Sequence, residues 1–363
     1  MKLAIIGSRG APACYGGFET LAEELGSRLA ARGHEVWVYG RSNFIDRELT
    51  TYRGMRLVVL PAPRRKHLET VVHTLLAAVH AAREGYDAVL LLNAANAPWT
   101  RILQLAGIPV ALNVDGLERK RRKWGWAGRS YYRICERLAA LMPDALVTDA
   151  EVIRRYYRRS YGAPSSMIAY GGDLTPPEGT ASLDELGLQP GEYLLYVSRF
   201  EPENNPDRVA RAYTRVPGVR PLVMVGGAPY APELARRLAA TDDPRILFPG
   251  PLYGEHYRQL LFNCRAYIHA TEVGGTHPAL VEAMGAGRAV LYYDTPENRE
   301  VVRGAGRPFR FQGAGSLERV LSELITDRNC LDELGARARQ RVAERYRWDE
   351  VARRYECLLE SLC

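Results

Sequence analysis

The feature that most constrains the fold of this chain is an alternation of short apolar strands with amphipathic helices, which occurs in two stretches. The first stretch opens with a strand at residues 2–6, a loop rich in glycine, and a helix at residues 18–32 that ends at Gly33. Such alternation is typical of parallel sheets covered by helices. Further elements are expected as strands at residues 34–39, 57–60, 88–92, 110–114 and 145–148, a helix at 69–83, and, in the second stretch, strands at 193–198, 222–226, 246–248, 266–269 and 289–293.

The length of the chain and one segment rich in proline and glycine indicate two domains. The chain has 363 residues, more than one typical domain holds. Residues 171–179 lack apolar periodicity, as a linker would. We therefore predict an α/β fold with two Rossmann-like, doubly wound domains, residues 1–172 and 173–345, that face each other across a cleft at the carboxyl ends of their strands. The last segment, residues 346–363, is expected to form a helix that packs back on the first domain.

The composition indicates the cellular compartment of the protein but does not identify its partner. No apolar run approaches the length of a membrane span, and the first residues lack a signal-peptide pattern. The six cysteines are scattered without a Cys-x-x-Cys pair, which disfavours a disulfide framework or a zinc site. These features favour a cytoplasmic protein. The net charge of +7 allows nucleic acid, acidic lipid or a phosphorylated metabolite as a partner and does not choose among them.

The second domain contains two candidate anion-binding turns. Gly274, Gly275 and Thr276 follow a predicted strand and precede Pro278, which suits the first position of a helix. Backbone amides and the positive helix end would then be directed at a phosphate. Glu282 lies one helical turn further on and would accept hydrogen bonds from a ribose hydroxyl. A capped helix with one exposed glutamate is the simpler alternative.

Two more residues of this domain follow predicted strands. Arg199 follows the first of them, and its fork of donors suits a diphosphate, although a solvated arginine is the alternative. Tyr253 follows a later strand and could stack on a pyrimidine or simply belong to a turn.

The first domain offers weaker signals. Residues 7–20 are not a Gly-x-Gly-x-x-Gly loop, which disfavours dinucleotide binding. Asp115 follows a strand and could orient or deprotonate a hydroxyl group, or could cap a helix in an Asp-Gly turn. Residues 119–132 combine basic and aromatic side chains, which suits an anionic membrane surface, a solvated face or, less well, RNA. The sequence has no Asp-x-Asp motif that would hold a metal.

The turn before Pro278 resembles the signature of glycosyltransferase family 4, in which a glutamate stands at each end of a nine-residue window. Glu282 matches the second glutamate. Gly274 stands at the first position, so that Glu272, or the amides of residues 274–276, would take over its contact with the donor sugar. Arg199 matches the arginine of an Arg-x-x-x-x-Lys phosphate clamp, and Asn204 stands in place of the lysine, which implies that Arg199 carries more of the phosphate charge. Three runs, at residues 7–20, 115–123 and 272–282, resemble a bacterial rhamnosyltransferase-like subfamily.

This resemblance implies a GT-B fold and a retaining, metal-independent transfer without a cofactor. The implied substrates are a dTDP- or UDP-linked hexose, with rhamnose from dTDP-rhamnose favoured, and a glycan acceptor, which is lipid-linked if the basic run contacts a membrane. Cell-surface polysaccharide synthesis is the implied context, and no nucleic-acid partner is expected. The resemblance implies a catalytic role for Asp115, Arg199 and Glu272, donor contacts from Gly16, Gly17, Arg199, Asn204, Tyr253, Gly274, Gly275, Thr276 and Glu282, and acceptor contacts from Glu19 and Glu118. A sugar-nucleotide epimerase of the same fold and a non-catalytic nucleotide-sugar-binding protein remain the alternatives.

Overall fold

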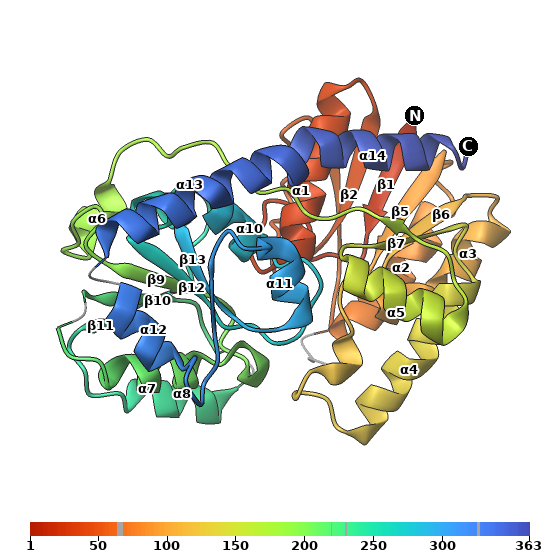
Figure 1. Cartoon of the computed structure of the whole chain (residues 1–363). Helices are drawn as coiled ribbons and strands as arrows, with labels where there is room; N and C mark the ends of the chain where they lie inside the picture. Colours follow the sequence, from red (N-terminus) through yellow and green to blue (C-terminus); the bar gives the residue numbers. More distant parts are fainter. Residues whose placement is uncertain (64–67, 219, 229–230, 325–326) are drawn as a thin grey trace. The chain divides into compact units, whose positions relative to one another are not determined.

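The computed structural model describes residues 1–63, 68–218, 220–228, 231–324 and 327–363, which form two compact units (Figure 1). Unit 1 contains Met1–Lys120, Trp124–Tyr170 and Trp348–Cys363. Unit 2 contains Gly171–Arg347 together with the three residues Arg121–Lys123. Unit 2 begins at Gly171 because the next residue already packs within it: a Cβ atom on Gly172 would lie 2.4 Å from Cγ1 of Val281.

Unit 1 is built on an eight-stranded sheet with the order β3-β4-β2-β1-β5-β6-β7-β8, parallel except for the pair β3–β4. Its strands are β1 (Lys2–Ile6), β2 (Glu35–Arg41), β3 (Thr51–Tyr52), β4 (Met55–Leu60), β5 (Ala88–Leu92), β6 (Val110–Asn113), β7 (Ala145–Thr148) and β8 (Ser166–Met167). Its helices are α1 (Gly17–Ala31), α2 (Glu69–Ala81), α3 (Thr100–Leu105), α4 (Trp126–Leu141), α5 (Glu151–Tyr161) and α14 (Trp348–Glu360), with 3-10 turns η1 (Ala94–Trp99) and η2 (Glu118–Lys120).

Both faces of this sheet are covered, as the period of two along β1 requires. Leu3 and Ile5 belong to one apolar core, to which α1 and α14 contribute. Ala4 and Ile6 belong to the other, to which α2, α3, α4 and α5 contribute. In the first core the α14 residues Trp348 and Tyr355 are fully buried, and the Tyr355 hydroxyl is 2.7 Å from Nδ2 of Asn113 in β6. The last helix is therefore an integral part of unit 1.

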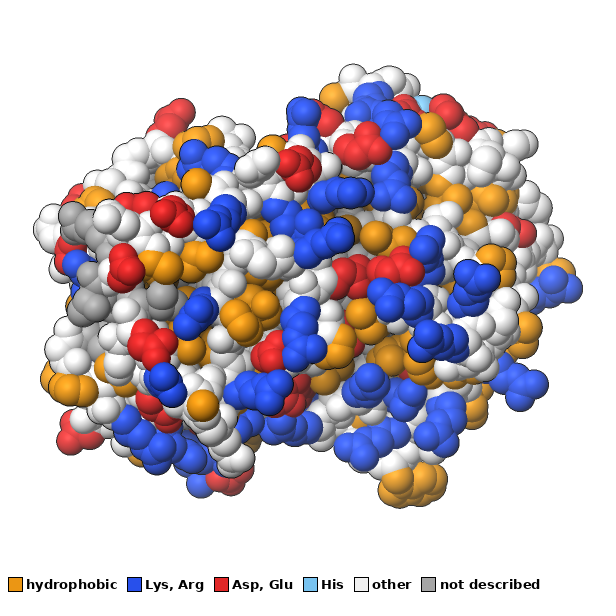
Figure 2. Space-filling view, in the orientation of Figure 1, with side chains coloured by type: hydrophobic (Ala, Val, Ile, Leu, Met, Phe, Trp, Pro, Cys, Tyr) orange, Lys and Arg blue, Asp and Glu red, His pale blue; other side chains and the backbone are white. Residues whose placement is uncertain are grey.

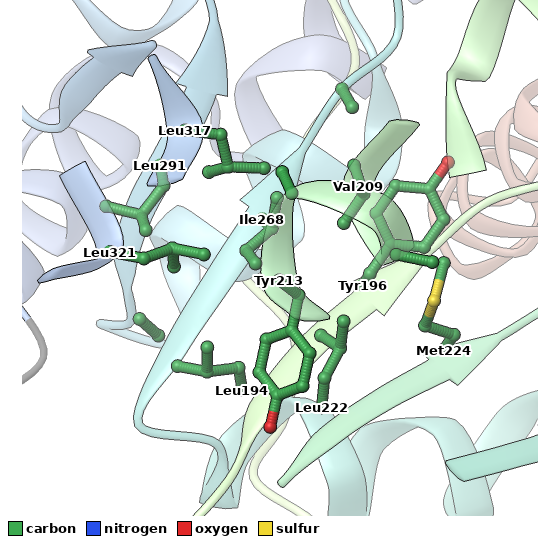
Figure 3. Close-up of a cluster of buried hydrophobic side chains, with 14 of the residues drawn as sticks. Leu194, Tyr196, Val209, Tyr213, Leu222, Met224, Ile268, Leu291, Leu317 and Leu321 are labelled. Carbon is green, nitrogen blue, oxygen red and sulfur yellow. The ribbon is translucent and has the colours of Figure 1, made fainter. Parts of the chain in front are cut away.

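Unit 2 is built on a six-stranded parallel sheet with the order β11-β10-β9-β12-β13-β14. Its strands are β9 (Leu194–Val197), β10 (Leu222–Val225), β11 (Ile246–Gly250), β12 (Ala266–His269), β13 (Ala289–Tyr293) and β14 (Arg307–Phe309). Its helices are α6 (Ala181–Glu185), α7 (Pro206–Thr214), α8 (Pro232–Ala239), α9 (Gly254–Asn263), α10 (Pro278–Gly285), α11 (Pro296–Val302), α12 (Leu317–Leu324) and α13 (Arg328–Arg345), with the 3-10 turn η3 (Pro202–Asn204). The strand residues Leu194, Leu222 and Leu291 share one apolar core with Tyr213 of α7 and Leu317 of α12; in Figure 3, Leu194 and Leu222 lie beside Tyr213, and Leu291 lies beside Leu317.

Each sheet has one position where the strand order reverses. In unit 1 the strands that follow β1 are added on one side of it, and the strands from β5 onward are added on the other side. In unit 2 the same reversal lies between β9 and β12. Ligands of open α/β sheets bind at such switch points, outside the carboxyl ends of the strands. The segments that follow these strands are therefore the first places to search for a site.

The predicted α/β class with two parallel-sheet domains is confirmed. The predicted strands agree with the observed ones to within two residues, because buried apolar runs bounded by turns carry a strong signal. The short strands β3, β8 and β14 were not predicted, since two or three residues are too few to show a period.

Candidate functional site

The segments after β9 and β12 meet at the switch point of unit 2. The backbone amide of Glu272 donates to the carbonyl of Glu203 at 2.9 Å, and Nδ2 of Asn205 donates to the carbonyl of Ala270 at 2.9 Å. Asn205 adopts the left-handed conformation, with φ 56° and ψ 36°, which turns the chain from η3 into α7. The structure therefore brings the predicted Arg199 segment and the predicted Gly274–Thr276 turn to one edge of the sheet.

Asn204 fixes the Arg199 segment from within. Its side chain is 4% exposed, and its Nδ2 donates to the carbonyl of Arg199 at 2.6 Å. Its own carbonyl accepts from the Tyr196 hydroxyl at 2.6 Å. At the position where the clamp pattern has lysine, the chain therefore holds a buried amide that shapes the loop.

Glu201 is the centre of a cluster of charged groups beside Arg199. Its carboxylate lies 3.5 Å from Nη1 of Arg121, 3.6 Å from Nζ of Lys123 and 4.0 Å from Nη1 of Arg199. Burial raises the pKa of Glu201, but the positive charges of Arg199, Lys123 and Arg121 outweigh burial and lower it to about 2. Arg121 also pairs with the fully buried Glu203 at 3.4 Å. This cluster was not predicted from the sequence, in which the run of basic residues before Trp124 is its one signal.

Glu272 lies in a second group of charges. Its Oε1 accepts from Nδ2 of Asn205 at 3.0 Å and lies 3.8 Å from Nη1 of Arg208, while its Oε2 pairs with Arg122. The side chain is 21% exposed. Both carboxylate oxygens therefore have protein partners, and contact with a donor sugar stays a prediction.

The turn before α10 is shaped by a buried histidine. A Cβ atom on Gly274 would lie 2.2 Å from Nε2 of His277, so only glycine fits against this ring. The His277 Nδ1 atom lies 3.0 Å from Oδ1 of Asn298 and 3.1 Å from Nε2 of His269. Pro278 occupies the first turn of α10, and His277 makes no side-chain hydrogen bond to that turn. Pro278 has no amide hydrogen, and the amides of Leu280 and Val281 donate to the His277 carbonyl at 3.1 and 3.2 Å. An anion at this turn would therefore be bound by the amide of Ala279 and by the amides of the preceding Gly274–Thr276 turn.

Glu282 is 6% exposed on α10, and its Oε2 accepts from the Tyr257 hydroxyl at 2.7 Å. Burial and the Glu282 carboxylate raise the pKa of Tyr257 well above its ordinary value, so Tyr257 remains a donor. Tyr253 follows β11, two strands from β9, and is 44% exposed. Its ring therefore has surface on which a base could stack.

In unit 1, the predicted residues at the switch point have well-defined contacts. Gly16 caps α1 and Gly17 begins it. Glu19, predicted to contact the acceptor, is 3% exposed and accepts from the backbone amide of Arg9 at 2.7 Å. Glu19 therefore holds the loop before α1, and its contact with an acceptor stays a prediction.

Asp115 and Glu118 follow β6. Asp115 has a φ of 53°, and its amide donates to Oδ1 of Asn113 at 2.9 Å. The backbone of Asp115 is therefore in the left-handed region directly after the strand, and its side chain is half-buried. Glu118 accepts from the indole nitrogen of Trp124 at 3.3 Å.

Part of the basic run that was predicted to contact a membrane pairs with groups of the protein itself. Arg119 pairs with Glu136 at 3.0 Å and donates to the Tyr156 hydroxyl at 2.9 Å. Arg121 and Lys123 face Glu201 in unit 2. These three side chains therefore pair with carboxylates of the protein, whereas Lys120, Arg122 and Arg129 are exposed, and contact of residues 119–132 with a membrane stays a prediction.

Exposed basic residues gather instead over α4 and α5, as Figure 2 shows. The arginines on these helices that face solvent are Arg129, Arg133, Arg137, Arg154, Arg155, Arg158 and Arg159. Among them α4 exposes Trp126 by 84%, Ile134 by 59% and Leu141 by 68%. Within the ranges that the structure describes, no helix combines the length and apolar character needed to cross a bilayer.

Comparisons with known proteins agree with this arrangement. A family model described as Glycosyl transferase 4-like domain matches residues 16–171, and one described as Glycosyl transferases group 1 matches residues 184–341. The chain is similar in structure to a sucrose-phosphate synthase from Thermosynechococcus elongatus, with a TM-score of 0.83 and 21% identity over 99% of this chain and 98% of that one. No curated protein gives a significant match.

Two further solved structures are similar over the length of the chain. HepE from Anabaena in complex with UDP-glucose has a TM-score of 0.77 and 16% identity, with 100% of both chains covered. A glycosyltransferase from Rickettsia africae has a TM-score of 0.72 and 14% identity over 99% of this chain and 97% of that one. At these identities the likeness shows the fold.

Proposed function

Since the chain belongs to the glycosyltransferases with the GT-B fold, we propose that it transfers a hexosyl unit from a nucleoside diphosphate sugar bound in unit 2 to a glycan acceptor, with retention of configuration. The finer proposal is rhamnose from dTDP-rhamnose and an acceptor of cell-surface polysaccharide synthesis, which rests on the three runs that resemble the rhamnosyltransferase-like subfamily.

The observation that carries the proposal is the convergence of Arg199 and the start of α10 at the switch point of unit 2. Arg199 follows β9 and the Gly274–Thr276 turn follows β12, and these two strands are neighbours. A guanidinium and a helix N-terminus both favour the negative charge of a diphosphate. Glu282, one turn into α10, would accept a hydrogen bond from the ribose.

In the proposed reaction, the bond from the anomeric carbon to the diphosphate oxygen breaks, and a bond to an acceptor hydroxyl oxygen forms. Negative charge grows on the leaving diphosphate, where Arg199 and the amides of Ala279 and the Gly274–Thr276 turn stabilise it. The hydroxyl proton leaves with the diphosphate or passes to a carboxylate. Asp115 of unit 1 is our candidate for orienting the acceptor or accepting this proton.

The first experiment measures binding of UDP, dTDP and their sugars to the purified protein by calorimetry and by thermal shift, because a ligand that binds only the folded state raises its stability. Arg199→Met should weaken diphosphate binding about tenfold or more. Arg215→Met, which removes an arginine that is 65% exposed in the same unit, should not. If the wild-type protein bound neither nucleotide, the proposal would fail.

The second experiment follows turnover. Incubation of dTDP-rhamnose and UDP-glucose with a panel of glycans should give products with retained anomeric configuration by NMR. Formation of an epimerised donor in the absence of acceptor would favour an epimerase. If the protein bound the donor but, with a broad panel of acceptors, neither transferred the sugar nor slowly hydrolysed the donor, a non-catalytic binding protein would be favoured.

We further propose that the acceptor is lipid-linked and that unit 1 contacts an anionic membrane through α4. This helix exposes Trp126, Ile134 and Leu141 beside three arginines. Exposed aromatic and aliphatic groups among cations suit the interface of a bilayer with acidic lipid.

A further inference from the structure

We propose that Lys123 supplies the second cation of the diphosphate site in unit 2, a role that the Arg-x-x-x-x-Lys pattern would give to position 204. This inference rests on the proposed function, because it concerns how the same site holds a nucleoside diphosphate. The segment that carries Lys123 leaves unit 1 for three residues and returns at Trp124.

The Lys123 ammonium group shares a carboxylate with Arg199. Its Nζ lies 3.6 Å from Oε1 of Glu201, and Nη1 of Arg199 lies 4.0 Å from the same oxygen. Two cations that share one carboxylate oxygen are neighbours. Lys123 thus lies beside the arginine that we place on the diphosphate.

Asn204 supplies no cation at the position where the clamp pattern has lysine. Its side chain is neutral, 4% exposed, and bound through Nδ2 to the carbonyl of Arg199. It holds the Arg199 backbone and contributes no charge. A diphosphate carries more negative charge than one guanidinium carries positive charge, so a second cation beside Arg199 would strengthen its binding.

Three cations of this cluster, Arg121, Lys123 and Arg199, lie beside the carboxylates of Glu201 and Glu203. Arg121 is 6% exposed and is engaged by both Glu201 and Glu203. Lys123 and Arg199 share the Glu201 carboxylate with Arg121. When a diphosphate binds, the flexible Lys123 stem lets the ammonium contact a phosphate oxygen while Glu201 stays in place.

The experiment compares UDP and UMP binding to the full-length protein by calorimetry. Lys123→Met should weaken UDP binding about tenfold, the effect of losing one charged hydrogen bond, and should weaken UMP binding much less. Lys120→Met is the matched control, since this exposed lysine lies three residues earlier in unit 1, and it should leave both affinities unchanged.

Two double variants separate direct contact from an indirect effect. Asn204→Lys in the Lys123→Met background should restore UDP binding, because it returns a cation to the same loop. Glu201→Gln in that background should not restore it. Restoration by Glu201→Gln would mean that Lys123 only neutralises Glu201, and it would overturn the inference.

The failure of this inference is distinguishable from failure of the proposed function. If wild-type protein bound UDP and Lys123→Met bound it equally well, only the role of Lys123 would fall. If wild-type protein bound neither UDP nor dTDP, both would fall. Urea unfolding without ligand shows whether Lys123→Met is destabilised. If it is, Lys123→Arg is tested in its place and is expected to bind UDP like the wild type. Weak UDP binding by a stable Lys123→Arg protein would also overturn the inference.

Discussion

Acidification should destabilise unit 2 through the two histidines that support the start of α10. His269 is 4% exposed at the end of β12, and its ring centroid is 4.8 Å from that of His277. Burial lowers the pKa of His277 from 6.5 to about 4, against a hydrogen bond with Asn298 that raises it, and the positive charges of Arg121 and Arg199 lower it further. Burial and the adjacent His277 ring lower the pKa of His269 well below 6.5.

The sign follows from proton binding. Between pH 6.5 and about 4 the unfolded chain binds a proton at position 277 and the folded protein does not. The free energy of unfolding therefore falls as the pH falls through this window, by about 2 kcal/mol from pH 7 to pH 5 for His277 alone. His269 acts in the same direction. Glu201 acts below this window, because its lowered pKa stabilises the fold above about pH 4.5 and the contribution is lost as the pH falls toward 2.

The assay is urea unfolding followed by far-UV circular dichroism and by tryptophan fluorescence. All five tryptophans lie in unit 1, so fluorescence reports on that unit and circular dichroism on both. His277→Gln should weaken the pH dependence of the unit 2 transition, whereas His256→Gln, at an exposed position on α9, should leave it unchanged. An identical pH dependence in wild type and His277→Gln would refute the reasoning.

Three other outcomes are expected. Glu282→Gln should weaken binding of UDP about tenfold by calorimetry, because a neutral amide replaces a charged acceptor; unchanged affinity would remove Glu282 from the donor site. Gly172→Ala should lower the free energy of unfolding by about 1–3 kcal/mol in urea titrations, because the new Cβ would press on Val281. Gly315→Ala, with no atom within 4 Å of its Cβ, is the control, and equal losses would contradict the packing argument. Joint replacement of Trp126 and Ile134 by serine should reduce sedimentation with vesicles of anionic lipid several-fold while nucleotide binding persists; equal sedimentation would exclude α4 as the contact.

The sequence predicted the fold well because its signals are local. Buried strands such as β5 and β12 are apolar runs bounded by turns, and their observed limits equal the predicted ones. The sequence also predicts that Arg199 and the Gly274–Thr276 turn lie at one sheet edge, because both follow strands of one parallel sheet and such strands end at a common edge.

The parts that could not be predicted depend on partners distant in the sequence. Lys123 was read as part of a surface run, yet it faces Glu201, which lies far along the chain. Glu19 was predicted to contact an acceptor, and nothing in the sequence indicated that it accepts from the Arg9 amide. The type of a charged residue in the sequence does not show which carboxylate or amide group will lie beside it in the folded protein.

The chain passes between the two units four times, and this bears on how hybrids of such enzymes can be made. A fragment that stopped at Tyr170 would lack Trp348 and Tyr355, both fully buried in the core of the unit it was meant to reproduce. A donor-side module cut out as residues 171–347 would lack Arg121 and leave the buried Glu203 without its guanidinium. To exchange donor specificity between two such proteins, one would therefore have to transfer residues 121–123, which lie within the sequence of unit 1, together with residues 171–347.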